Sequence, residues 1–151
     1  MRERWRSGLR LALAAVYGPF GMLHMARPRA FLPIMPPWVP WPQTVVVATG
    51  ACEVAGAIGL LHPRTRKAAA IGLALYAVCV YPANIYHAVA HRHVPPLPDS
   101  LWYHVPRLLF QPVFVWWALF AGGVTSWPWP PARSGAEPRS PRRRDGNDAR
   151  P

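Results

Sequence analysis

Four long apolar stretches dominate the pattern of hydrophobic and polar positions along the chain. They cover about residues 9–26, 44–61, 68–90 and 106–124, and few charged side chains fall inside them. A helix needs about 20 predominantly apolar residues to cross a hydrocarbon core of about 30 Å. The pattern therefore predicts an all-α fold: a four-helix transmembrane bundle with up-down-up-down topology.

The segments between the stretches differ in composition from them. Residues 27–43 hold six prolines and two tryptophans, which cannot continue a helix across lipid and suit the outer interface. Within the second stretch, Ala51, Ala55 and Gly59 recur every four residues and predict a seam for close helix packing. We expect a membrane domain over residues 1–126 and a disordered basic tail over 127–151, where apolar residues are almost absent.

The net charge of +11 sits in blocks. Thirteen of the 17 Lys and Arg residues precede the first span, separate the second from the third, or follow the fourth. The blocks comprise Arg2, Arg4, Arg6, Arg10, Arg64, Arg66, Lys67, Arg133, Arg139, Arg142, Arg143, Arg144 and Arg150. This positive-inside bias predicts a multi-pass protein of the bacterial inner (plasma) membrane with both termini cytoplasmic. It also argues for the lipid bilayer, and against nucleic acid, as the partner of the basic residues.

The basic start could also belong to a signal peptide. His24, two residues before Ala26, is a poor match to a cleavage site. We therefore expect the segment to remain as the first span.

Polar residues inside the spans are the candidates for function. Glu53 is the single acid within a span, and a charge at that depth costs about 3 kcal/mol, so it should face protein. Side chains at helical spacing on the other spans form matching polar faces. These are Tyr17, Gly21 and His24; Asn84, His87 and His91; and His104, Arg107 and Gln111.

From these faces we predict one polar pocket that opens outward, with Glu53 at its floor and Arg107 as its charge partner. The candidate ligand-binding residues are His24, Glu53, Asn84, His87, Arg107 and Gln111. A packing network of interhelical hydrogen bonds is the alternative, and both interpretations stay open. No catalytic residue and no metal site is assigned. Cys52 and Cys79 lie at similar depths, and we expect small packing residues rather than a redox pair.

Several short motifs carry a family likeness. They are Gly21 to His24 before the Pro-rich Phe31 to Trp38, Gly50-Ala51-Cys52-Glu53 with Gly59-Leu60-Leu61 and Pro63-Arg64, Tyr81-Pro82-Ala83-Asn84-Ile85-Tyr86, and Arg107 with Gln111. Over about residues 8–122 the chain resembles the DoxX-like family of small four-helix membrane proteins. Leu109 stands where that family writes proline, and Pro112 follows the glutamine instead.

The resemblance implies a four-helix bundle associated with membrane redox chemistry, and its polar positions correspond to His24, Glu53, Asn84, Arg107 and Gln111. We therefore expect an accessory or quinone-binding component of a membrane redox system, with a quinone as the one cofactor to consider. If the protein were an enzyme, it would be a subunit of a quinone-linked oxidoreductase. The alternatives are a purely structural or assembly protein, and a proton or small-solute conduit that uses Glu53.

Overall fold

The structure, a computed structural model, describes residues 2–90 and 100–129. Within these ranges the chain forms four α-helices and one 3-10 helix: α1 (Arg2–Ala26), η1 (Pro28–Ile34), α2 (Pro42–Leu61), α3 (Arg66–Val89) and α4 (Leu101–Ala121). The same ranges contain no strand. The prediction of an all-α protein is therefore confirmed, and each of the four apolar stretches lies on its own α-helix.

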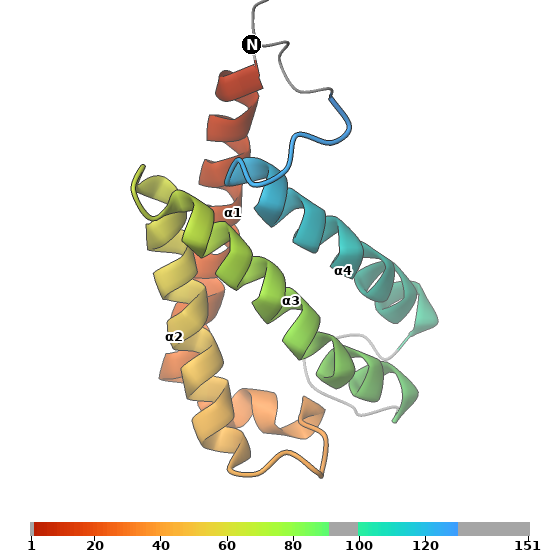
Figure 1. Cartoon of the computed structure of the whole chain (residues 1–151). Coiled ribbons are helices and arrows are strands. Elements are labelled where there is room, and N and C mark those ends of the chain that lie inside the picture. Colours follow the sequence, from red (N-terminus) through yellow and green to blue (C-terminus); the bar gives the residue numbers. More distant parts are fainter. Residues whose placement is uncertain (1, 91–99, 130–151) are drawn as a thin grey trace, which may run out of the picture.

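The helices pack in two pairs, α1 with α2 and α3 with α4 (Figure 1). Helix α2 also packs along α3, α1 touches α4, and η1 contacts α1, α2 and α3. Among the described residues no Cα atom of α2 lies within 8 Å of a Cα atom of α4. At the top of Figure 1, the start of α1, the α2–α3 turn and the end of α4 come together, whereas towards the other end the two pairs diverge.

An apolar core closes the bundle where the pairs meet. Its central side chains come from all four α-helices and are buried: Leu13, Leu60, Ala70, Leu73, Ala118 and Ala121. We call this set the apolar layer. Along the helices it lies between the start of α1 and the level of Tyr17 and Ala57, so it separates the basic end of the molecule from everything beyond that level.

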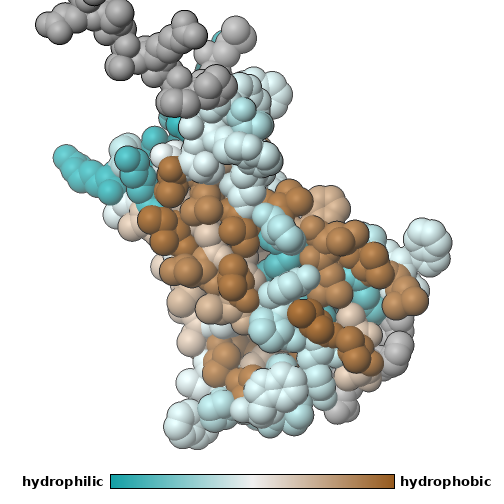
Figure 2. Space-filling view, turned by 45° about the vertical axis from the view of Figure 1, so that its right-hand side comes forward, coloured by the Kyte–Doolittle hydropathy of each residue, from teal (hydrophilic) through white to brown (hydrophobic). Residues whose placement is uncertain are grey.

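Large apolar side chains also cover the outside of the helices, as in a protein whose solvent is lipid. Leu11, Phe20, Ile58 and Leu75 are all exposed, and Figure 2 shows broad apolar areas divided by a band of polar side chains. By length and composition, three helices can cross a membrane: α1 from Glu3, α2 and α3.

Helix α4 is not among those three. It has 21 residues, enough for a span of about 30 Å. It carries Pro106, Arg107 and Pro112 within its length, however, and these lower its hydropathy. The structure therefore supports a membrane protein, while the fourth span remains a prediction.

Helices α1 and α2 approach closely at a pair of glycines. A Cβ atom on Gly21 would lie 2.6 Å from the carbonyl oxygen of Gly50, and a Cβ on Gly50 would lie equally close to the carbonyl oxygen of Gly21. The predicted seam is wrong at Ala51 and Ala55, which are exposed. The face of α2 that packs against α1 carries Gly50, one residue before Ala51. Glycine has no Cβ and therefore permits a closer approach than alanine.

The first three residues of the predicted tail, 127–129, pack against the end of α4. Residues 127–129 form a turn in which Trp127 lies edge-on to Trp116 of α4, and Trp129 lies beside Phe120. These aromatic contacts extend the packed region past the helix end. The rest of the predicted tail, and His91 of the polar face predicted on the third span, lie outside the described residues.

Candidate functional site

Glu53 lies buried among three helices, where it contacts side chains from α1 and α3. Its Oε2 atom is 2.6 Å from Nδ1 of His24, and its Oε1 accepts a hydrogen bond of 2.7 Å from the Tyr76 hydroxyl. The Tyr17 ring is also buried and lies edge-on to the Tyr76 ring, with centroids 5.9 Å apart. These four residues form the Glu53 cluster. As its cost in lipid predicts, the acid faces protein.

The glycine crossing positions this cluster. His24 lies three residues beyond Gly21 on α1, and Glu53 lies three residues beyond Gly50 on α2. A Cβ on Gly50 would come within 2.7 Å of the His24 Cβ, so the imidazole can reach the carboxylate only because α1 and α2 pack glycine to glycine. Phe31 of η1 then covers the His24 ring, with centroids 4.0 Å apart.

A second group of polar side chains joins α3 to α4. Arg107 donates hydrogen bonds to Asn84 Oδ1 and, over 3.0 Å, to His87 Nδ1. Asn84 in turn donates to Gln111 Oε1 over 3.3 Å, and Gln111 donates to the backbone carbonyl of Ala77. We call Asn84, His87, Arg107 and Gln111 the Arg107 cluster. Arg107 and Gln111 of α4 donate to α3, and Asn84 of α3 donates back to Gln111, so hydrogen bonds join the two helices in both directions.

These hydrogen bonds determine which ring nitrogen of His87 carries a proton. A guanidinium has only donors, so Nδ1 of His87 must be the acceptor, and a proton on the ring must sit on Nε2. His87 is completely buried, and the His104 ring lies edge-on to it at 4.8 Å. In this geometry His87 is therefore neutral, and the positive charge of the cluster stays on Arg107.

The predicted pairing of Glu53 with Arg107 is wrong. Both carboxylate oxygens are occupied by His24 and Tyr76, and Arg107 is bonded to Asn84 and His87. The reason is topological, since Glu53 is on α2 and Arg107 is on α4, and these two helices do not touch in the described part of the chain. The six predicted residues thus form two clusters rather than a single pocket.

A comparison with protein families places the chain. The family model described as "Domain of unknown function (DUF8561)" matches residues 13–122. The chain belongs to this family. The match includes all six predicted site residues, and no curated protein and no solved structure matches. The resemblance to the DoxX-like family stays a prediction.

Tyr76 is the site residue that the sequence interpretation missed, because tyrosine in an apolar helix usually serves packing. A signal was present in the spacing. Helices α2 and α3 are joined by a short turn at residues 62–65, and Glu53 and Tyr76 lie at similar distances before and after it. Counting outward from that turn places the hydroxyl level with the carboxylate.

Other candidates do not come together at these clusters. Cys52 and Cys79 are both free and exposed, so neither packs in the protein core. Within residues 2–90 and 100–129, no group of three His, Cys, Asp or Glu side chains is placed to hold a metal ion.

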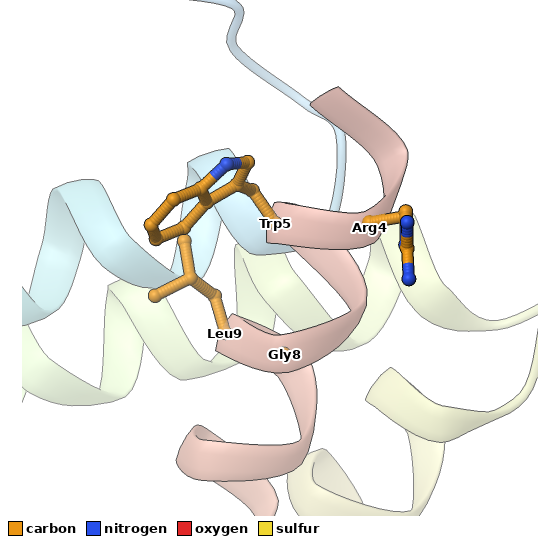
Figure 3. A pocket seen from close by; sticks show the side chains of 4 residues that line it. All are labelled: Arg4, Trp5, Gly8 and Leu9. Carbon is orange, nitrogen blue, oxygen red and sulfur yellow. The ribbon is translucent and has the colours of Figure 1, made fainter. Parts of the chain in front are cut away.

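Cavities lie at the basic end, away from both clusters. One, of about 420 Å³, is lined by Arg4, Trp5, Gly8 and Leu9 of α1. In Figure 3 the Trp5 and Leu9 side chains lie together on one side of α1, and Arg4 points to the other. A second cavity at this end is lined mainly by cationic side chains.

Proposed function

We propose that the protein spans the membrane four times with both termini in the cytoplasm. We further propose that it binds a small amphipathic, quinone-like molecule at the Glu53 and Arg107 clusters. In this proposal it serves a membrane redox system as an accessory component rather than as the catalyst. The link to redox chemistry rests on the resemblance to the DoxX-like family, and the binding site rests on the geometry of the two clusters.

The observation that carries the proposal is that Glu53 and Arg107 do not neutralise each other. Glu53 is 4% exposed on a helix long and apolar enough to cross a membrane, and Arg107 is half-buried on α4, the proposed fourth span. Ionisable groups at such depth are costly, and they mark sites of function more often than sites of packing. Glu53 has His24 and Tyr76 as partners, and Arg107 has Asn84 and His87, so no acid of the described residues is paired with Arg107.

The two clusters offer complementary chemistry to a ligand with two carbonyl oxygens. Arg107 uses two of its five N–H groups in the contacts described above, so it retains donors for one carbonyl. His24, which contacts Glu53, can donate to the other carbonyl and exchange a proton with the carboxylate. Gln111 has both ends of its amide engaged, so we assign it to the positioning of Asn84 rather than to ligand contact.

Of the alternatives, a conduit across the membrane has the least support. A proton path from Glu53 towards the basic end would have to pass Leu13, Leu60 and Leu73, which are buried and apolar. The other alternative is a purely structural or assembly protein, and the binding experiment must distinguish it from a ligand-binding protein.

Binding of decylubiquinone to the purified, detergent-solubilised chain tests the proposal. We expect saturable quenching of tryptophan fluorescence. We also expect an affinity at least tenfold weaker in Arg107→Gln, because a charged donor to the carbonyl is lost. Arg29→Gln, which removes an exposed arginine from η1, is the matched control and should bind as wild type. Absence of saturable binding to the wild type would refute the proposal, and loss of thermal stability with unchanged affinity would favour assembly.

The proposed topology has its own test. A reporter that is active only in the cytoplasm, fused after Pro151, is expected to be active, and the same reporter inserted after Pro40 is expected to be silent. Alkaline phosphatase, which is active only outside the cytoplasm, should give the opposite pattern at both sites. Activity of the phosphatase fusion at Pro151 would contradict four spans with cytoplasmic termini.

A further inference from the structure

A second ligand site is indicated at the basic end of the bundle, independent of the quinone proposal. A cavity of about 400 Å³ opens there between the start of α1, the α2–α3 turn and the residues that follow α4. Five cationic side chains line it: Arg6, Arg10, Arg64, Arg66 and Lys67. Glu3 is the one acid in the lining, and Pro63, Gly122 and Gly123 complete the wall. We call this the basic cavity.

Several of its cations are not simply spread over the surface. Arg10 is buried, and it donates hydrogen bonds to the carbonyl oxygen of Ala121, the Ser7 hydroxyl and the Glu3 carboxylate. The Nε atoms of Arg6 and Arg66 are buried and have no acceptor in the described part of the chain. Burying a charged donor without an acceptor is costly. Because these atoms are closed to the cavity, a bound oxyanion would offset their cost through its negative charge rather than through a direct hydrogen bond.

The Glu3 carboxylate occupies part of the position proposed for that oxyanion. The Glu3 Oε1 atom lies 3.1 Å from Arg10 Nη2 and 3.6 Å from Arg66 Nη1, so one carboxylate bridges two arginines. The Glu3 side chain is 66% exposed, whereas those of Arg10 and Arg66 are 7% and 25% exposed. The arginines are thus held by the fold, while the acid that bridges them sits at the mouth and can be displaced.

We propose that the basic cavity binds an anionic phosphate group. Phosphate has the charge and the number of acceptor oxygens to engage several arginines at once. Basic pockets between membrane helices bind phospholipid headgroups in this way. Trp5, on the same turn of α1, is exposed, and tryptophan in that setting marks the membrane interface. The phosphate is carried by a lipid headgroup or by a free phosphate compound, and the two sources are separable by experiment.

Calorimetric titration of the purified full chain in detergent tests the proposal. The probes are dioctanoyl phosphatidylglycerol, sodium phosphate, and dioctanoylglycerol, which has the same acyl chains without phosphate. We expect saturable binding of the phosphatidylglycerol and none of dioctanoylglycerol. Sodium phosphate that competes with the lipid would show that the phosphate group alone suffices, and phosphate that does not compete would assign the site to a lipid headgroup. Equal binding of dioctanoylglycerol, or no saturable binding of either phosphate probe, overturns the proposal.

Two variants with a matched control locate the site. Arg66→Gln should weaken phosphatidylglycerol binding about fivefold, and Arg4→Gln should stay within about twofold of wild type. Both changes remove one positive charge from the same end of the molecule. Arg4, however, lines the other cavity, so it serves as the control. Equal weakening in both would mean general surface attraction and would contradict a defined site.

Glu3→Gln gives a result that misfolding cannot imitate. Removing the carboxylate that competes for Arg10 and Arg66 should tighten phosphatidylglycerol binding about threefold. Unchanged or weaker binding in Glu3→Gln would contradict the proposal that the Glu3 carboxylate and the lipid phosphate compete for the same arginines.

Discussion

Gly21→Ala is expected to lower the free energy of unfolding by about 2–3 kcal/mol, the cost of forcing extra volume into a packed interface. The added Cβ would lie 2.6 Å from the carbonyl oxygen of Gly50 and 2.8 Å from the Cβ of Glu53. Neither neighbour is the free end of a flexible side chain, so α1 and α2 must move apart. Because this crossing holds His24 against Glu53, the same change should disrupt the Glu53 cluster. Denaturant unfolding in detergent micelles, followed by circular dichroism, measures the loss.

Gly18→Ala is the matched control for that experiment. It lies one turn earlier on α1, and its added Cβ would meet the Ala57 Cβ at 4.0 Å, an ordinary van der Waals contact. Alanine is favoured over glycine within a helix by about 1 kcal/mol, so this variant should be as stable as wild type or slightly more stable. Similar losses in Gly18→Ala and Gly21→Ala would mean that helix backbone effects, rather than the crossing, determine stability.

His24→Leu is expected to cost about 3 kcal/mol, because it leaves a buried carboxylate with Tyr76 as its sole described partner. Leucine retains apolar bulk against Phe31, so most of the loss should come from electrostatics and hydrogen bonding. The measurement is again the free energy of unfolding in micelles at pH 7. A loss below about 1 kcal/mol would show that Glu53 does not depend on His24 for its stabilisation.

The double variant His24→Leu/Glu53→Gln separates structure from function at this cluster. The amide removes the unpaired charge and still offers an acceptor to the Tyr76 hydroxyl, so at least half of the lost stability should return. Quinone binding should not return with it, because the imidazole proposed to donate to the quinone carbonyl is still missing. Recovery of both stability and binding would assign the cluster to packing alone.

The sequence predicted the helices well because their signal is local. Each apolar stretch is long enough to define a helix without reference to the others, and the four α-helices follow the predicted spans. The differences lie at the ends. Helix α1 begins at Arg2 rather than near residue 9, since basic residues remain good helix formers beyond the apolar stretch. Residues 28–34, which are rich in proline, form η1 because a 3-10 turn accepts proline at its start.

The site was predicted in its residues but not in their partners. Helical spacing identifies which polar side chains share a face of one helix, and it grouped Asn84 with His87 and Arg107 with Gln111 correctly. It contains no information on which helices are neighbours. The pairing of Glu53 with Arg107 assumed that opposite charges would meet, whereas α2 packs against α1 and α3 and leaves α4 out of reach. The pairing of Glu53 with His24 follows from a backbone contact between two glycines, which periodicity does not reveal.

The apolar layer has a consequence for energy conversion. Leu13, Leu60 and Leu73 fill the bundle on one side of the Glu53 cluster, so under the proposed function its protons would exchange with a single compartment. Reduction and reoxidation of a bound quinone would then return each proton to the side it came from. Turnover at this site would be electrically silent, and any contribution to the membrane potential would have to arise in a partner.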